Sequence, residues 1–252
     1  MKNSGESASR PVILFCGKGG VGKTTLSAIT IQLLCGRGDR RILAVDADPA
    51  MGLALTLGIT PECSLDDVLS DEDSLRGGRD EVSASLDYEI SRCIKESGNV
   101  SFIALGRPEA QGCFCAVNHL LKKAIEKLSL AFDAVVIDAE AGVEQINRRV
   151  FDAVSHLFVV TDPTKKGVMV ADTILSLSRR TIRSDYCALI LNRLKAGDGI
   201  SLDTAAGFDS WCRIPEDSGI RFFDLHGGEP LLLTRTSAAA RLVSYLGDLK
   251  LI

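Results

Sequence analysis

The sequence predicts a single-domain α/β fold in which a mostly parallel central sheet carries helices on both faces. Short runs of apolar and β-branched residues alternate with segments whose apolar residues recur at helical spacing. The strand-like runs are continuously apolar, which is typical of strands covered on both faces. Sheets of this kind bind ligands beyond the carboxyl ends of their strands, and the motifs described below fall at such ends.

The expected elements follow the alternation along the chain. Strands are expected at Val12–Cys16, Arg41–Val45, Val100–Leu105, Ala134–Ile137, Leu157–Val160, Ala188–Leu191 and Trp211–Ile214. Helices are expected at Thr24–Cys35, Val117–Leu128, Gln145–Asp152, Val168–Arg180 and Ala238–Leu249. Residues 71–98 are charged and rich in Ser and Gly, and this ambiguous stretch is compatible with an insertion that contains a helix around Tyr88–Lys95.

The length of 252 residues and the hydrophobic content of 46% are enough for one substantial core. We expect one domain over residues 11–252, preceded by a polar, flexible extension at residues 1–10. A net charge of −4 does not favour nonspecific binding to nucleic acid or anionic lipid. The extension lacks the apolar stretch of a signal peptide, and no apolar run is long enough to span a bilayer. We therefore expect a cytoplasmic protein without nucleic-acid or membrane partners.

A glycine-rich motif lies between the first expected strand and the first expected helix. Its residues are Gly17, Lys18, Gly19, Gly20, Val21, Gly22, Lys23, Thr24 and Thr25. The spacing matches a Walker A loop, in which backbone N–H groups and the positive end of the following helix surround phosphate oxygens. Lys23 is expected to reach the β- and γ-phosphates, and the hydroxyl of Thr24 to bind Mg²⁺. The sequence thus predicts a P-loop ATPase.

Lys18, directly after the first glycine, gives the loop the deviant form KGGVGKT. This form resembles the family that contains MinD, ParA and the nitrogenase iron protein. The resemblance implies that Lys18 reaches across a homodimer to the nucleotide of the partner. There it would stabilise charge on the transferring phosphoryl group. A solvated lysine beside the loop is the alternative.

Three carboxylates follow expected strands and are assigned to catalysis and Mg²⁺. By the same resemblance, Asp48 positions or activates the attacking water, and Asp46 supports Mg²⁺ through water. Asp138 ends the apolar run Ala134–Ile137 and looks like the Walker B carboxylate. Gly142 then lies in a second switch segment and is expected to offer its N–H to the γ-phosphate.

The base of the nucleotide is assigned to residues near the end of the chain. Asn192 and Arg193 follow the strand Ala188–Leu191, and in this family an asparagine at that place bonds to the edge of adenine. Pro215 follows Trp211–Ile214 and resembles the segment that flanks the base. No Asn/Thr-Lys-x-Asp guanine motif is present, so ATP is favoured over GTP. A strand-terminal asparagine is also a common turn former.

The segment Gly112-Cys113-Phe114-Cys115 places two thiols at positions i and i+2. They can converge on one metal ion if the intervening residue turns the chain. A symmetric dimer would supply a second pair on its two-fold axis. Four thiolates suit Zn²⁺ in a tetrahedron and Ni²⁺ or Cu²⁺ in a square plane. Two small buried hydrophobic side chains are the alternative interpretation.

The surroundings of these cysteines resemble the CooC-type nickel-insertion ATPases, which are accessory proteins of carbon monoxide dehydrogenase. The resemblance lies in the run from Gly112 to Leu121 and in the run Ile137-Asp138-Ala139-Glu140-Ala141-Gly142-Val143-Glu144. It implies an ATP-driven homodimer that binds Ni²⁺, or Zn²⁺, through Cys113 and Cys115. The dimer would deliver nickel to carbon monoxide dehydrogenase or to the related acetyl-CoA synthase.

The other six cysteines are expected to be reduced, with structural or incidental roles, because a long P-loop chain without a secretory leader is not a disulfide scaffold. They are Cys16, Cys35, Cys63, Cys93, Cys187 and Cys212.

Two other functions are compatible with the deviant loop. A reductase like the nitrogenase iron protein needs a cysteine soon after the Walker B aspartate, and residues 139–150 contain none. A positioning ATPase of the MinD/ParA type needs a membrane-binding helix or a basic DNA-binding face. The stretch Ala238–Ile252 has only Arg241 and Lys250 as cations, so we expect it to pack on the sheet as the last helix.

Overall fold

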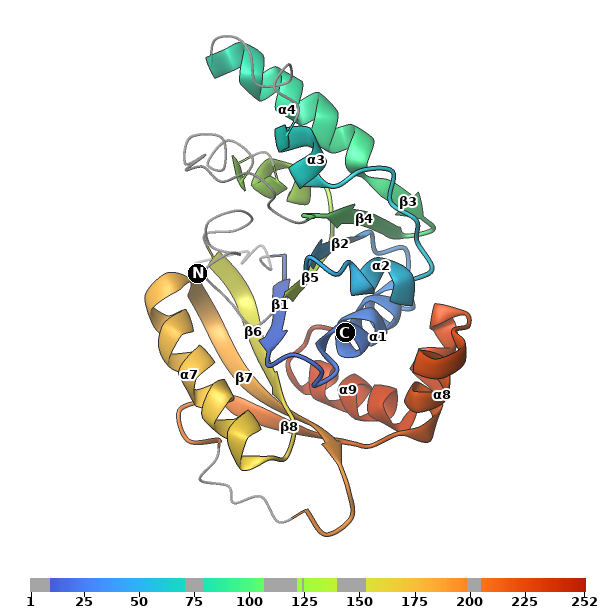
Figure 1. Ribbon diagram of the computed structural model, residues 1–252, viewed down its shortest axis with the longest axis vertical. Coiled ribbons are helices and arrows are strands. Elements are labelled where there is room, and N and C mark those ends of the chain that lie inside the picture. Colours follow the sequence, from blue (N-terminus) through green and yellow to red (C-terminus); the bar gives the residue numbers. More distant parts are fainter. Residues whose placement is uncertain (1–9, 71–78, 107–121, 124, 140–152, 199–204) are drawn as a thin grey trace, which may run out of the picture.

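The protein folds around a twisted sheet with helices on both of its faces (Figure 1). A computed structural model describes residues 10–70, 79–106, 122–123, 125–139, 153–198 and 205–252. Within these residues the sheet has the strand order β3-β4-β2-β5-β1-β6-β7-β8. Only the pair β3–β4 is antiparallel, and the other neighbours run parallel. The predicted α/β fold with a mostly parallel sheet is confirmed.

Seven of the eight strands in the described residues agree with the expected positions, two of them are much longer, and β3 was not expected. Their bounds are β1 Val12–Gly17, β2 Ile42–Ala47, β3 Lys95–Ser97, β4 Val100–Ala104, β5 Ala134–Ala139, β6 Ala153–Thr161, β7 Arg183–Leu194 and β8 Ser210–Pro215. The early part of β6 is mostly half-buried, and the first residues of β7 alternate between exposed and half-buried, unlike the apolar runs that predicted these strands. The order places β1 between β5 and β6, so the P-loop lies at the centre of the sheet.

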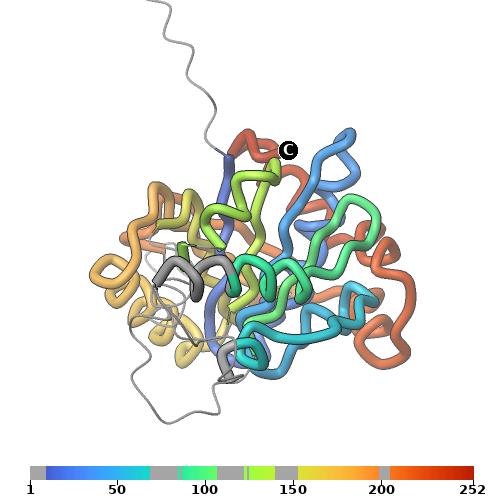
Figure 2. The backbone as a smooth tube through the Cα atoms, turned by 90° about the horizontal axis from the view of Figure 1, so that it is seen from above, coloured from blue at the N-terminus to red at the C-terminus, as the bar shows by residue number. Residues whose placement is uncertain are grey.

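The helices form two layers. Their bounds are α1 Lys23–Cys35, α2 Gly52–Thr56, α3 Leu65–Ser70, α4 Arg79–Cys93, α7 Lys165–Thr181, α8 Ser218–His226, the 3₁₀ helix η3 Pro230–Arg235 and α9 Ser237–Asp248. Figure 2, viewed along a perpendicular direction, shows α7 and α8 at opposite sides of the molecule.

Two hydrophobic clusters make the core, one on each face of the sheet. Alternate residues of β1 face opposite clusters, because side chains alternate along a strand. Leu14 packs in the cluster with α4 and α7, and Ile13 packs in the cluster with α1 and α9. The helix α9 buries its apolar face against the second cluster, so the expected packing of the last helix on the sheet is confirmed. No helix of the described residues is long and apolar enough to cross a membrane.

The segment between β2 and β4 differs from the expectation. The helix expected around Tyr88–Lys95 is α4, which ends at Cys93, and Lys95 already begins the edge strand β3. Cys63 and Cys93 form a disulfide, with Cα atoms 5.0 Å apart. The expectation of reduced, incidental thiols is therefore wrong for this pair. The cause is tertiary: α4 brings its last residue back to the loop that precedes α3, 30 residues earlier in the chain.

Helices α8 and η3 were not expected. Asp217 caps α8 by accepting N–H bonds from Gly219 and Ile220, and the same carboxylate also binds Ser237 at the start of α9. One aspartate therefore joins α8, which lines the cavity described below, to the start of α9. The expected helix Gln145–Asp152 lies outside the described residues, and of Val117–Leu128 the structure describes 122–123 and 125–128 as helical.

Candidate functional site

The P-loop connects β1 to α1, and its first and last glycines, Gly17 and Gly22, leave no room for a side chain. Gly17 has φ +148°, and a Cβ there would lie 2.1 Å from the carbonyl oxygen of Val160. Gly22 has φ +95° and precedes α1, and a Cβ there would lie 2.5 Å from Nδ2 of Asn192. Space is open around Gly19 and Gly20. The loop is thus packed tightly against β6 and β7 at its two ends and is accessible in its middle.

Lys23 is buried at the first position of α1, and its ammonium group reaches back to the P-loop. Its Nζ donates to the carbonyl oxygen of Lys18 at 3.2 Å. A lysine side chain has three donors, and anions or dipoles around it offset the cost of burying its charge. The site therefore suits an anion at the positive end of α1.

Three aspartates gather beside the loop at the ends of β2 and β5. Asp46 and Asp138 are opposite each other in the ladder between these strands, and both side chains are fully buried. Asp48 is half-buried, and its charge acts on Asp138. The expected cluster of Asp46, Asp48 and Asp138 around the P-loop is present.

Asp138 has one carboxylate oxygen fixed and one without a partner. Ser27 of α1 donates to Oδ1 at 3.2 Å, and Thr24 also bonds to this carboxylate. Oδ2 is buried and has no hydrogen-bond partner. Burial raises the pKa of Asp138 to about 6, against the opposing effects of Thr24 and Lys23. An orphaned buried oxygen beside a threonine hydroxyl fits a hard cation with oxygen ligands such as Mg²⁺.

Asp46 has a structural task that the sequence did not reveal. Its Oδ1 accepts from the N–H of Asp48, and its Oδ2 accepts from Leu53 and Ala54 at 2.9 and 3.3 Å. It thereby anchors the first turn of α2. Burial, together with the charge of Asp138, raises the pKa of Asp46 to about 7 despite these bonds. Two buried carboxylates with raised pKa values are typical of a site completed by a cation.

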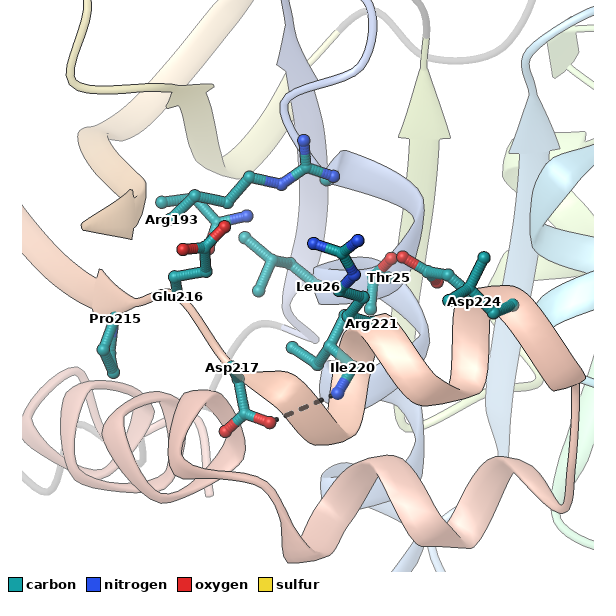
Figure 3. A pocket seen from close by; sticks show the side chains of 12 residues that line it. Thr25, Leu26, Arg193, Pro215, Glu216, Asp217, Ile220, Arg221 and Asp224 are labelled. Atoms are coloured by element: carbon teal, nitrogen blue, oxygen red, sulfur yellow. Dashed lines mark hydrogen bonds between the residues drawn. The ribbon is translucent and has the colours of Figure 1, made fainter. Parts of the chain in front are cut away.

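A cavity of about 330 Å³ lies on the other side of the α1 N-terminus (Figure 3). Asn192, Arg193 and Pro215 line it, as does Thr25 from α1. The cavity is therefore continuous with the P-loop, and it contains all three residues assigned to the base. Sequence reasoning missed the wall contributed by α8, which supplies Ile220, Arg221 and Asp224.

The side chain of Asn192 is buried and held by the P-loop. Its Nδ2 donates to the carbonyl oxygen of Val21 at 2.8 Å. A carbonyl can only accept, so this contact fixes the orientation of the amide, whose Oδ1 can then accept from a ligand. Arg193, the next residue, has φ +61° beside an irregularity between β7 and β8. Such strained conformations in non-glycine residues cluster at binding sites.

Sequence reasoning also missed two partners of the predicted residues. One is Ser27, which orients Asp138; the other is Asp162, whose Oδ2 lies 3.6 Å from Nζ of Lys18. Asp162 directly follows the end of β6, and the rule that ligand-binding residues follow strands could have found it. Gly142, Cys113 and Cys115 lie outside the described residues. Among the residues that the structure describes, no cluster of three or more His, Cys, Asp or Glu forms a metal site.

Comparison with known proteins agrees with this geometry. A family model described as an anion-transporting ATPase matches residues 10–62, which include the P-loop. An uncharacterised ATP-binding protein of Methanocaldococcus jannaschii is 33% identical over 86% of this chain and 88% of its own length. The carbon monoxide dehydrogenase accessory protein CooC of Rhodospirillum rubrum is 30% identical over 85% of this chain and 87% of its own.

The fold of this chain is also similar to that of proteins with solved structures. The cell division protein MinD of Aquifex aeolicus superposes with a TM-score of 0.68 at 20% identity, over 95% of this chain and 96% of that one. With the P-loop, the buried aspartates beside it and relatives at 30% identity or more over most of their length, the chain belongs to the MinD/ParA family of P-loop ATPases.

Proposed function

We propose that this ATPase is a metallochaperone whose nucleotide-dependent homodimer binds Ni²⁺ through paired Cys113 and Cys115 and helps to insert nickel into carbon monoxide dehydrogenase or the related acetyl-CoA synthase. The observation that carries the proposal is the 30% identity to the carbon monoxide dehydrogenase accessory protein over most of both chains. The Cys-x-Cys segment supports it, because two thiolates from each chain make a four-sulfur site for a borderline metal ion.

The phosphates of ATP bind along the P-loop from Gly17 to Thr25. Backbone N–H groups of the open middle of the loop and the positive end of α1 face the phosphates. The ammonium of Lys23 exchanges the Lys18 carbonyl for phosphate oxygens, which are stronger acceptors because they carry charge. Mg²⁺ would be held by the hydroxyl of Thr24, with Asp138 and Asp46 acting through water. The ion would neutralise charge on the phosphates.

Hydrolysis requires a water molecule in line with the γ-phosphate. Asp48, the most accessible of the three aspartates, orients this water or accepts its proton. Gly142 offers an N–H to the γ-phosphate. In the closed dimer, Lys18 of each chain reaches the nucleotide bound by the other. There it stabilises the charge that develops during phosphoryl transfer.

The orientation of Asn192 selects the base. With Nδ2 held by Val21, the free Oδ1 accepts a bond from the 6-amino group of adenine. Guanine carries a carbonyl oxygen at that position, and two acceptors facing each other repel. Arg193 and Pro215 enclose the base within the cavity. ATP is therefore the substrate favoured over GTP.

Metal binding and nucleotide binding are coupled in this proposal. Both ATP and nickel favour the same closed dimer, so each ligand strengthens the binding of the other by the same factor. Hydrolysis removes the γ-phosphate, weakens the dimer and splits the four-sulfur site. The nickel ion is then released to the client enzyme as cargo.

The test is nickel binding by a Cys113→Ser/Cys115→Ser double variant in equilibrium dialysis with a nonhydrolysable ATP analogue. We expect the wild type to bind one nickel ion per dimer and the double variant to bind none. Cys35→Ser is the matched control, because Cys35 is a free and partly exposed thiol on α1. Nickel stoichiometry in the double variant equal to that of the wild type and the control would defeat the proposal.

A further inference from the structure

The lysine that defines this loop is already engaged within its own chain. Nζ of Lys18 lies 3.6 Å from Oδ2 of Asp162, and each side chain is about one-quarter to one-third exposed, at 35% and 25%. The contact joins the P-loop after β1 to the end of β6, the neighbouring strand of the sheet. It is therefore a contact between the two strand ends closest to the phosphate site.

Asp162 is arranged for this contact by the start of α7. Its Oδ1 accepts from the N–H of Thr164 at 3.3 Å and from the hydroxyl of the same residue. The hydroxyl in turn accepts from the N–H of Gly167 and caps α7. A Cβ at Gly167 would lie 2.2 Å from Oδ1, so the helix leaves little room for this carboxylate to move. With Oδ1 fixed in the turn, Oδ2 faces Lys18.

The charge state of Asp162 agrees with this arrangement. Partial burial alone would raise the pKa of the carboxyl group. The bonds from Thr164 and the charge of Lys18 outweigh that effect and hold the pKa of Asp162 below its ordinary value. Asp162 is thus an anion at neutral pH.

Lys18 is held at its backbone as well. Its carbonyl oxygen accepts the bond from Nζ of Lys23. When phosphate recruits Lys23, this backbone contact is lost, whereas the ion pair between the Lys18 side chain and Asp162 does not depend on it. Nucleotide binding therefore removes the backbone contact of Lys18, and the ion pair has to be broken separately.

We propose that Asp162 is a positioning residue that holds Lys18 in its own chain and competes with the transfer of this lysine to the nucleotide of the partner subunit. The inference rests on the proposed function, in which Lys18 acts across the dimer. Asp162 would keep the protomers apart until nucleotide is bound, and after hydrolysis it would take Lys18 back and favour separation.

The expected change in the dimer dissociation constant follows from the partial exposure of the ion pair between Lys18 and Asp162. Partly exposed ion pairs shift an equilibrium by about two- to fivefold. Closing the dimer breaks one pair in each chain, so the two factors multiply to about 4- to 25-fold in the dimer dissociation constant. The effect is smaller at high salt, because screening weakens exposed charge pairs.

Asp162→Asn tests the inference, since an amide oxygen can still accept from Thr164 while the negative charge is removed. The dimer dissociation constant is measured by analytical ultracentrifugation with Mg²⁺ and a nonhydrolysable ATP analogue, at about 0.05 and 1 M salt. We expect the variant to dimerise about 4- to 25-fold more tightly at low salt, with a smaller difference at high salt. Asp248→Asn, at the end of α9, removes an equal charge elsewhere and is expected to match the wild type.

Asp162→Ser is a second variant that keeps a hydroxyl in the turn, and it serves if the asparagine variant is unstable. Dimers of either variant that are as weak as, or weaker than, those of the wild type overturn the inference. Lys18→Ala separates this outcome from a failure of the proposed function. If Lys18→Ala loses the dimer while Asp162→Asn leaves its strength unchanged, only the inference fails. If Lys18→Ala dimerises normally, the proposed role of Lys18 fails, and the inference fails with it.

Discussion

The amide of Asn192 is bonded to the P-loop itself, with Nδ2 2.8 Å from the carbonyl oxygen of Val21. The loop that receives the phosphates and the residue assigned to the base are thus one hydrogen-bonded unit. Gly22 lies against the same amide, so this part of the loop can approach β7 only because it carries no side chain. Phosphate binding and base selection are therefore expected to change together when this contact is altered.

Replacement of Asn192 by alanine is expected to lower the preference for ATP over GTP. The variant loses the acceptor for the 6-amino group and leaves the carbonyl of Val21 without its partner, which together cost about 1–3 kcal/mol in ATP binding. Isothermal titration calorimetry with nonhydrolysable analogues of both nucleotides measures the ratio of ATP to GTP affinity. Asn99→Ala, at an exposed turn, is the control. An unchanged ratio of ATP to GTP affinity would contradict the assignment.

Gly17→Ala is expected to destabilise the protein by more than about 2 kcal/mol, because its Cβ would lie 2.1 Å from the carbonyl oxygen of Val160 and φ is positive. Gly19→Ala is the matched control, since nothing lies within 4 Å of its Cβ position. Urea denaturation without nucleotide measures the unfolding free energy of each variant. Equal unfolding free energies for the two variants would show that the loop is not packed against β6 as described.

These results show which parts of the site were accessible to sequence reasoning. The P-loop residues and Asp138 were found because their motif is local: a strand, a fixed glycine spacing and an apolar run that ends in aspartate. The partner of Asn192 was not found, because it depends on the packing of β7 and α1, which no local pattern records. The contact of Lys18 with Asp162 likewise depends on β6 being the neighbour of β1.

The parts of the fold that were predicted wrongly or missed also lack a local sequence pattern. The first residues of β7, Arg183 to Tyr186, alternate between exposed and half-buried and lack the apolar run that marks a strand buried on both faces. Helix α8 has only nine residues and buries only Phe223, so its pattern is short. The disulfide could be predicted only from the position of α4 in the tertiary structure. The cysteine count and the class of protein favoured reduced thiols instead.

Asp138→Asn is expected to stabilise the nucleotide-free protein at alkaline pH while weakening the binding of Mg²⁺ and nucleotide. The pKa of Asp138 is raised from 3.8 to about 6, so the folded state binds the proton more tightly than the unfolded state. The wild type therefore loses stability as pH rises from about 4 through 6, by up to about 3 kcal/mol. The variant has no such charge to bury.

Unfolding free energies of the wild type and Asp138→Asn at pH 4 and pH 8, without divalent cations, check this prediction. The unfolding free energy of the variant should be nearly equal to that of the wild type at pH 4 and should exceed it most at pH 8. Asp133→Asn, on the loop before β5, is the control for loss of a carboxylate at a mostly exposed place. A variant that is less stable than the wild type at pH 8 would contradict the account of a costly buried charge.

The disulfide between Cys63 and Cys93 is expected to stabilise the protein through the loop that it closes. A loop of about 30 residues gives roughly 3–4 kcal/mol in the chain-entropy model. Cys93→Ser should lower the unfolding free energy by about this amount under oxidising conditions and by much less in dithiothreitol. Peptide mapping without reduction should recover the two cysteines as one linked pair. Free thiols at both positions in protein purified without reductant would contradict the pairing.

Native mass spectrometry of the wild type tests whether ATP closes a dimer that shares one metal ion. With Mg²⁺, Ni²⁺ and a nonhydrolysable ATP analogue, we expect a species of two chains, two nucleotides and one nickel ion. The protein without nucleotide should be a monomer. If the nucleotide-bound protein stays a monomer, or forms a dimer that carries no nickel, the proposed shared metal site is wrong.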